Sequence, residues 1–199
     1  MLRSLVLTGG PGAGKTSAAL ALADCNPGRF ILVPEAATQI YQMLHTRWSA
    51  LDAAGRRDVQ LRIYHLQIEQ ETRLQQLHPE KILLLDRETV DGAAYWPDGP
   101  DDYWLNIGTT HQAELDRYDA VIWLECSATL GRYDGSASNP CRSEGATAAM
   151  ELDRSIERLW SGHRNFHRVR ACPRFAQKLA AVCSLVDGWF KAAPEAGRS

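Results

Sequence analysis

The chain has 199 residues, of which 45% are hydrophobic and 23% charged, and its net charge is −2. The near-neutral charge disfavours nucleic acid or an anionic membrane as a partner, and no apolar run approaches the roughly 18 residues that cross a membrane. The five cysteines are scattered without a C-x-x-C pair, which indicates reduced thiols in a cytoplasmic protein.

The first predicted strand, residues 3–8, leads into a glycine-rich segment and then a predicted helix at residues 15–25. Gly9-x4-Gly14-Lys15-Thr16 fits the phosphate-binding pattern G-x-x-x-x-G-K-S/T. Glycines let several backbone N–H groups converge on one anion, and the helix adds the positive end of its dipole. We expect Lys15 to reach the β- and γ-phosphates of ATP, and the Thr16 hydroxyl to bind Mg²⁺. The predicted nucleotide-binding residues are Gly10, Pro11, Gly12, Ala13, Gly14, Lys15, Thr16 and Ser17.

Glu35 follows the second predicted strand, residues 30–34, and precedes a predicted helix at residues 36–47. Ligands bind beyond the carboxyl ends of parallel strands, so Glu35 is expected on the acceptor side of the nucleotide. A carboxylate there can take the proton from an acceptor hydroxyl. The alternative is an acid that only complements the helix dipole.

Asp86 ends the third predicted strand, residues 81–86, which follows a long predicted helix at residues 57–78. An apolar run that ends in Asp, after a phosphate-binding loop, is the Walker B pattern. Asp86 is therefore expected to hold Mg²⁺ beside Thr16.

Arg87 could hold a substrate phosphate or stabilise charge on the transferred group, or it could form a salt bridge to a neighbouring helix. Asp91 and Tyr95 are four residues apart, hence on one helical face, and are candidates for binding the acceptor. Trp96 and Trp104 flank an acidic stretch that we interpret as a loop at residues 97–106, and they could line an acceptor pocket.

The second half of the chain continues the alternation of strands and helices. Residues 127–145 are rich in glycine and serine and are interpreted as a mobile lid. Arg142, with Arg132, could neutralise charge on a phosphoryl group when the lid closes, although loop arginines also simply face solvent. The remaining predicted elements are a helix at residues 109–117, a strand at 120–125, a helix at 146–163, a strand at 166–171 and a helix at 173–191.

This pattern predicts an α/β fold, namely a three-layer P-loop NTPase with a lid. We expect a five-stranded, mostly parallel sheet in the kinase-like order 2-3-1-4-5, with helices on both faces. The length favours one domain over residues 1–192, with a disordered tail at residues 193–199. Nothing in the pattern indicates an oligomeric state.

Several motifs together resemble the family of small P-loop "AAA domain" ATP-binding proteins. That family is related to the ribosylnicotinamide kinase domain of the bacterial NAD regulator and to the animal TRPL translocation defect protein. The resemblance covers about residues 2–183, and it rests on Gly9–Thr16, Val33–Ala36, Leu85–Arg87 with Asp91–Tyr95, Tyr118–Glu125 and Asn139–Glu144.

The layout is also similar, more distantly, to deoxynucleoside and thymidylate kinases. That similarity implies an acceptor-side role for Glu35, a carboxylate–arginine pair at Asp86 and Arg87, and a lid arginine at Arg142. Residues 86–88 read Asp-Arg-Glu here, where deoxynucleoside kinases usually have Glu-Arg-Ser.

The leading hypothesis is a kinase that transfers the γ-phosphoryl group of ATP, with Mg²⁺, to a hydroxyl of a small nucleoside-like metabolite. Its catalytic residues would be Lys15, Glu35, Asp86, Arg87 and Arg142, and Glu35, Arg87, Asp91 and Tyr95 would bind the acceptor. The alternative is a nucleotide-dependent switch or ATPase without a small-molecule acceptor. The chain has no N-K-x-D sequence and no D-x-x-G after the third predicted strand, which are signatures of Ras-type GTPases, and its charge disfavours a polynucleotide kinase.

Overall fold

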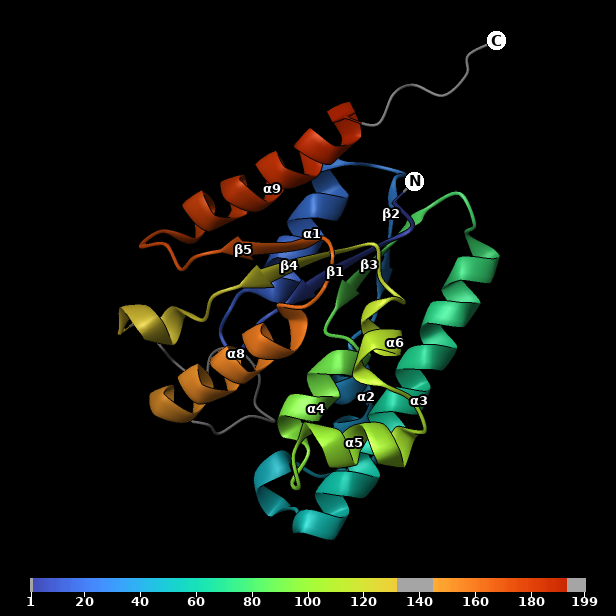
Figure 1. Cartoon of the computed structure of the whole chain (residues 1–199). Helices are drawn as coiled ribbons and strands as arrows, with labels where there is room; N and C mark the ends of the chain where they lie inside the picture. Colours follow the sequence, from blue (N-terminus) through green and yellow to red (C-terminus); the bar gives the residue numbers. More distant parts are fainter. Residues whose placement is uncertain (1, 132–144, 193–199) are drawn as a thin grey trace.

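Five parallel strands form the central sheet of the protein (Figure 1). A computed structural model describes residues 2–131 and 145–192. All four neighbouring pairs of strands are parallel, so the sheet of the described chain is parallel throughout. The order β2-β3-β1-β4-β5 confirms the prediction for β1 (Ser4–Thr8), β2 (Phe30–Val33), β3 (Ile82–Asp86), β4 (Ala120–Leu124) and β5 (Phe166–Val169).

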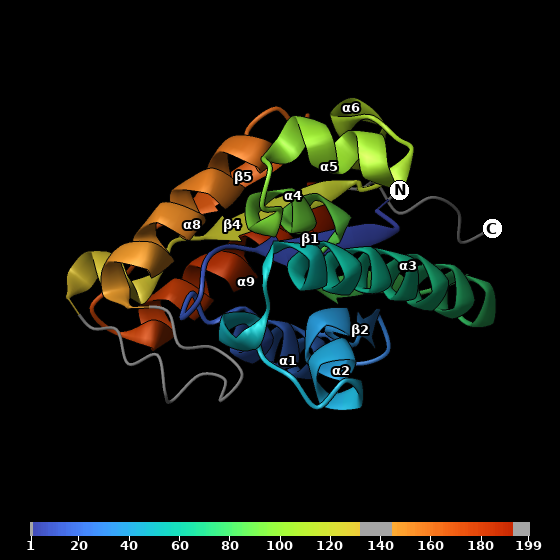
Figure 2. The ribbon, with the colours of Figure 1, turned by 90° about the horizontal axis from the view of Figure 1, so that it is seen from below.

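Helices cover both faces of this sheet, as Figure 2 shows. One face packs against α1 (Lys15–Cys25) and α9 (Phe175–Ala192), through Leu5, Leu7, Leu22, Val182 and Val186. The other face packs against α3 (Ala53–Leu77), α4 (Gly92–Tyr95), α5 (Pro100–Ile107), α6 (His111–Leu115) and α8 (Ala146–Trp160). Strands β1 and β4 are buried along their whole length, which is why they appear in the sequence as unbroken apolar runs.

Helix α2 (Ala36–Met43) follows β2 and packs against α3. Three short 3₁₀ helices complete the described chain: η1 (Trp48–Ala50), η2 (Thr89–Asp91) and η3 (Ser127–Leu130). In the part of the chain that the structure describes, no helix is both long enough and apolar enough to span a membrane.

The acidic stretch at residues 97–106 is not a loop, and this prediction was wrong. Most of it forms α5, with Pro100 in the first turn and Asp101 and Asp102 beside it. Proline is compatible with a helix start, and acids there complement the helix dipole, so this composition marks the beginning of a helix. Gly108 ends α5 in the left-handed conformation, with φ 71°.

Other helix boundaries also differ from the prediction, and the largest differences, of four residues, are at the start of α3 and at the end of α2. Helix α3 begins four residues earlier than expected, because the Asp52 side chain caps it by accepting a hydrogen bond from the Gly55 amide at 2.8 Å. Helix α2 ends at Met43, and the chain turns at His45, which has φ 49°. Of the predicted lid, the structure describes residues 127–131 and 145. Arg132, Arg142 and the predicted tail at 193–199 lie outside the described residues.

Candidate active site

The phosphate-binding loop connects β1 to α1, as predicted, and its glycines are required by geometry. Gly9, Gly12 and Gly14 have positive φ values of 135°, 72° and 84°. A Cβ atom on Gly9 would lie 2.2 Å from the Leu124 carbonyl oxygen, and one on Gly14 would lie 2.4 Å from the Phe175 ring. The loop therefore packs tightly against neighbouring elements in a conformation that larger residues cannot adopt.

Lys15 is buried, and its ammonium group folds back over the loop. Its Nζ atom donates to the carbonyl oxygens of Gly9, at 2.8 Å, and Gly10, at 3.1 Å. These contacts hold the cation at the mouth of the loop, where the phosphates of a nucleotide would lie.

Thr16 and Asp86, the two predicted Mg²⁺ ligands, are in direct contact. The Thr16 hydroxyl donates a hydrogen bond to Asp86 Oδ2, while Asp86 Oδ1 is buried and has no hydrogen-bond partner among the described residues. Burial raises the pKa of Asp86, and the nearby Lys15 opposes that shift. An unsatisfied carboxylate oxygen beside a hydroxyl fits a Mg²⁺ ion, which binds oxygen ligands.

Residues 2–131 and 145–192 contain no cluster of three or more His, Cys, Asp or Glu side chains that could hold a metal. A Mg²⁺ ion at Thr16 and Asp86 would therefore take its other ligands from nucleotide phosphates and water, as is usual for this ion.

Glu35 and Arg87 face each other from the ends of β2 and β3. Glu35 Oε1 lies 3.3 Å from Arg87 Nε, and Glu35 Oε2 accepts a hydrogen bond from Thr38 Oγ1 at 2.7 Å. Glu35 is the N-cap residue of α2, yet its side chain makes no capping hydrogen bond. Arg87 thus forms an ion pair at the start of a neighbouring helix, which was the alternative expected from the sequence, and its partner is another predicted site residue.

Arg87 has a left-handed backbone conformation, with φ 74°, and its side chain is buried. Its guanidinium lies 5.2 Å from the centre of the Tyr95 ring, and Nη1 donates to the Tyr95 hydroxyl. Burial lowers the pKa of Arg87, but Tyr95, Glu35 and Asp91 outweigh it and raise the pKa overall, so the side chain stays cationic. Its Nη2 atom makes no hydrogen bond to the described chain.

Asp91 ends η2 and is only 3% exposed. Its Oδ1 atom accepts hydrogen bonds from Thr8 Oγ1 and Trp160 Nε1, both at 2.7 Å, whereas Oδ2 is buried without a partner in the described structure. Burial raises the pKa of Asp91, and Arg87 opposes that shift most strongly. One oxygen of Asp91 thus links η2 to β1 and α8, and the residue also lines a cavity.

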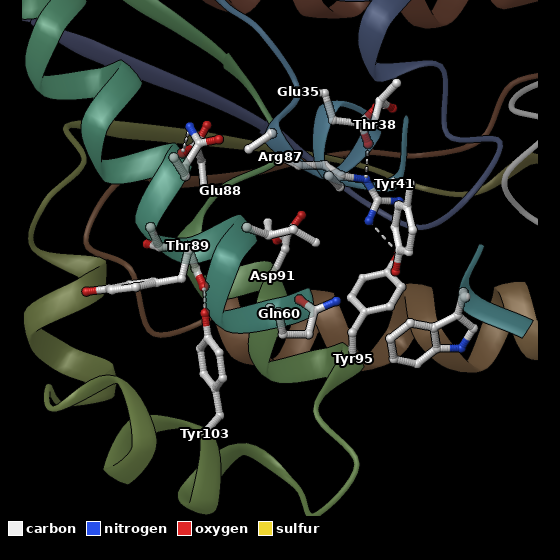
Figure 3. A pocket seen from close by; sticks show the side chains of 17 residues that line it. Glu35, Thr38, Tyr41, Gln60, Arg87, Glu88, Thr89, Asp91, Tyr95 and Tyr103 are labelled. Atoms are coloured by element: carbon white, nitrogen blue, oxygen red, sulfur yellow. Dashed lines mark hydrogen bonds and ion pairs between the residues drawn. The ribbon is translucent and has the colours of Figure 1, made fainter. Parts of the chain in front are cut away.

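Glu35, Arg87, Asp91 and Tyr95 line one cavity beside the phosphate loop (Figure 3). Sequence reasoning missed most of its walls, which include Tyr41, Trp48, Gln60, Tyr64, Glu88 and Tyr103. The Trp48 ring packs edge-on against Tyr95, with ring centres 5.7 Å apart. Glu88 lies between β3 and η2, directly after Arg87, whereas the other five come from α2, η1, α3 and α5, where no local motif marks them.

Trp96 and Trp104 do not line this cavity, which corrects the prediction. Both are buried in the core behind Tyr103, with ring centres 5.3 Å and 4.9 Å from the Tyr103 ring. Helix α5 presents Tyr103 rather than Trp104 to the cavity, and Trp96, which precedes this helix, is held against it by a hydrogen bond from Nε1 to Asp102 Oδ2 at 2.6 Å.

Glu88, the third residue of Asp-Arg-Glu, lines the cavity and forms a buried acidic cluster with Glu71. Gln67 Nε2 donates to Glu88 at 3.0 Å and to Glu71 at 3.1 Å, and the Tyr118 hydroxyl donates to both carboxyl groups at 3.1 Å. Burial raises the pKa of Glu88 well above its ordinary value, and the neighbouring Glu71 raises it further. Glu88 is therefore a buried, hydrogen-bonded part of the cavity wall, and its surroundings disfavour the charged form.

The comparisons with known proteins agree with this geometry. The AAA domain family matches residues 4–173. A solved deoxyadenosine kinase from M. mycoides, with the products dCMP and a flexible dCDP bound, has a TM-score of 0.61 to this chain at 14% sequence identity. The match covers 93% of this chain and 99% of that one, and at this identity it shows the shared fold.

No curated protein sequence matches the chain. The family match nevertheless extends over most of its length, from β1 past β5. Together with the phosphate loop and the strand order, it shows a nucleotide-binding domain of the P-loop class. The chain belongs to the AAA domain family and is a P-loop phosphotransferase or ATPase.

Proposed function

We propose that the protein is a small-molecule kinase, which transfers the γ-phosphoryl group of ATP to a hydroxyl of a nucleoside-like metabolite. The observation that carries this proposal is the cavity next to the phosphate loop, which combines Glu35, Arg87 and Asp91 with aromatic walls. A switch or ATPase without an acceptor needs a nucleotide site but has no use for a second polar and aromatic cavity.

The proposed roles follow from the contacts of each side chain. Lys15 and the loop amides hold the phosphates, and Arg87 neutralises charge on the transferred group. Arg142, which lies outside the described residues, is assigned the same role from the sequence alone. The acceptor oxygen attacks the γ-phosphorus, the bond to the bridging oxygen breaks, ADP leaves, and the acceptor proton passes to Glu35. Mg²⁺, held by Thr16 and Asp86, would neutralise negative charge on the phosphates.

The aromatic lining supports a flat acceptor. Trp48, Tyr95 and Tyr41 offer ring surfaces, and aromatic groups gain from offset or edge-to-face contacts with such rings. Asp91 and Arg87 also line this cavity, and each keeps one buried polar atom, Oδ2 and Nη2, without a hydrogen-bond partner in the described chain. The similar solved protein is a deoxyadenosine kinase with dCMP bound, which favours the same class of acceptor here.

We further propose that residues 1–192 act as one nucleotide-binding domain in the cytoplasm, with a nucleotide and a small-molecule acceptor, but no nucleic acid, as partners. The free thiols of Cys25, Cys126, Cys172 and Cys183 are consistent with a reducing compartment.

The test is acceptor-dependent release of ADP. The protein is incubated with ATP and Mg²⁺ and with a panel of nucleosides and other small hydroxyl metabolites. We expect saturable turnover with at least one acceptor, which Glu35→Gln lowers by about 10²–10⁴-fold because the general base is lost. ADP affinity should be unchanged, and the exposed Glu69→Gln serves as the matched control. Slow turnover that needs no acceptor and is unaffected by Glu35→Gln would favour the switch instead.

A further inference from the structure

Two charged side chains from outside the phosphate-loop motif form hydrogen bonds to the backbone of the loop. Asp153 on α8 is the first and is only 2% exposed. Its Oδ1 atom accepts the Gly10 amide hydrogen at 2.6 Å, and its Oδ2 atom accepts the Cys126 amide hydrogen at 2.9 Å. Because Cys126 follows β4, one carboxylate ties the start of the loop to the end of a central strand.

Lys178 on α9 is the second and is 5% exposed. Its ammonium group donates to the Ala13 carbonyl oxygen at 2.6 Å and to the Glu125 carbonyl oxygen at 2.5 Å. Ala13 lies in the second half of the loop, and Glu125 lies beside Cys126 at the end of β4. Lys178 thus holds two backbone carbonyl groups, one in the loop and one at the end of β4, just as Asp153 holds two backbone amide groups at the same two places.

The loop therefore lies between α8 and α9, where Figure 2 shows it, and each helix contributes one buried charge of opposite sign. Burying a charge is costly unless it is fully hydrogen-bonded, and apolar side chains would pack these helices at least as well. The two charges instead fix the orientation of the loop backbone, because each one holds two backbone groups in a defined orientation. Small residues are needed at the contact, since a Cβ atom on Gly10 would lie 2.7 Å from Asp153 Cβ.

We propose that Asp153 and Lys178 are positioning residues of the nucleotide site, which hold the phosphate loop against β4 in the conformation that receives the nucleotide phosphates. Amides that already point inward bind an anion without a reorganisation cost, and the Lys178 ammonium adds positive potential on the far side of the loop. This inference concerns the nucleotide site and does not depend on the existence of an acceptor.

The pH dependence of nucleotide binding should reflect Lys178. Burial lowers its pKa to about 8, and the groups that face it, Asp153, Cys126, Glu125 and Cys172, partly oppose that shift. Since a bound polyanion favours the ammonium form, ADP affinity should fall as the pH rises through about 8. Arginine stays charged throughout this range, and methionine is never charged.

The experiment measures the affinity of the full chain for ADP with Mg²⁺ by calorimetry from pH 6.5 to 9.5. We expect Asp153→Asn and Lys178→Met each to weaken ADP binding by about tenfold or more at pH 7, the equivalent of one or two charge-assisted hydrogen bonds. Substitutions of exposed residues on the same helices, Glu151→Gln and Lys191→Met, should leave the ADP affinity within about twofold of the wild-type value. The decrease in affinity near pH 8 should disappear in both Lys178→Met and Lys178→Arg, with the arginine variant retaining the tighter binding.

Wild-type ADP affinity in Asp153→Asn and Lys178→Met would overturn the proposal. An unchanged pH profile of ADP affinity in Lys178→Arg would also overturn it. This variant keeps the positive charge and two hydrogen-bond donors, so it tests the proposal even if Asp153→Asn fails to fold. Because ADP binding needs no phosphoryl acceptor, failure here is distinguishable from failure of the proposed kinase activity.

Discussion

Asp91 offers a test of how one buried carboxylate serves both the fold and the acceptor cavity. Replacing it with alanine removes the acceptor of two hydrogen bonds and leaves Thr8 Oγ1 and Trp160 Nε1 without their partner. Each unsatisfied buried polar group costs about 1–3 kcal/mol, so Asp91→Ala should lower the free energy of unfolding by about 2–6 kcal/mol.

Asp91→Asn is the variant to compare with Asp91→Ala, because it removes the charge and keeps a hydrogen-bond acceptor. The asparagine carbonyl oxygen can still accept both hydrogen bonds, and the substitution removes a carboxylate whose pKa is raised by burial. We therefore expect its free energy of unfolding to stay within about 1 kcal/mol of the wild type. Urea unfolding at pH 7, followed by circular dichroism, gives both differences from the midpoints and slopes.

The two variants should separate on function as well. If Oδ2 of Asp91 contacts the acceptor, Asp91→Asn should raise the acceptor KM while ADP affinity stays at the wild-type level. Equal destabilisation by Asn and Ala would refute the reasoning, since it would show that the charge of Asp91, rather than its hydrogen-bond geometry, supports the fold.

Three further predictions concern the loop, the buried acidic cluster and the cavity wall. Lys15→Ala should abolish ATP binding in calorimetry, and retained affinity would contradict the phosphate-loop assignment. The folded-state pKa of Glu88 lies well above 4.5, so this group stabilises the fold fully below about pH 4.5 and less as the pH rises. Glu88→Gln should therefore reduce the fall in unfolding free energy between pH 5 and pH 8 by up to about 1.4 kcal/mol per pH unit, measured by urea unfolding. The exposed Glu69→Gln should leave that slope unchanged. Trp48→Ala removes an aromatic wall of the cavity, so it should raise the acceptor KM about tenfold or more in the ADP-release assay, with no change in ADP affinity.

The phosphate loop could be recognised from the sequence because the residues that define it are contiguous in the chain. Gly9 to Thr16 carry their own backbone requirements, and the surrounding strand and helix were predicted within a residue. The order of the strands was predicted as the one typical of P-loop kinases, and the structure has it. The shared edge for Glu35 and Arg87 followed because parallel strands place their carboxyl ends together.

What the sequence by itself determined is therefore the fold class, the nucleotide site and the strand-end residues. The tertiary structure decided the rest, because those features depend on how helices pack. Trp48 and Gln60 reach the cavity from η1 and α3, while Trp96 and Trp104 turn into the core once α5 forms. Asp153 lies 143 residues from the amide that it holds, and Lys178 lies 165 residues from its loop carbonyl. No local pattern encodes such contacts, since a buried Asp or Lys on an amphipathic helix is identified only by the backbone groups that the fold brings to it.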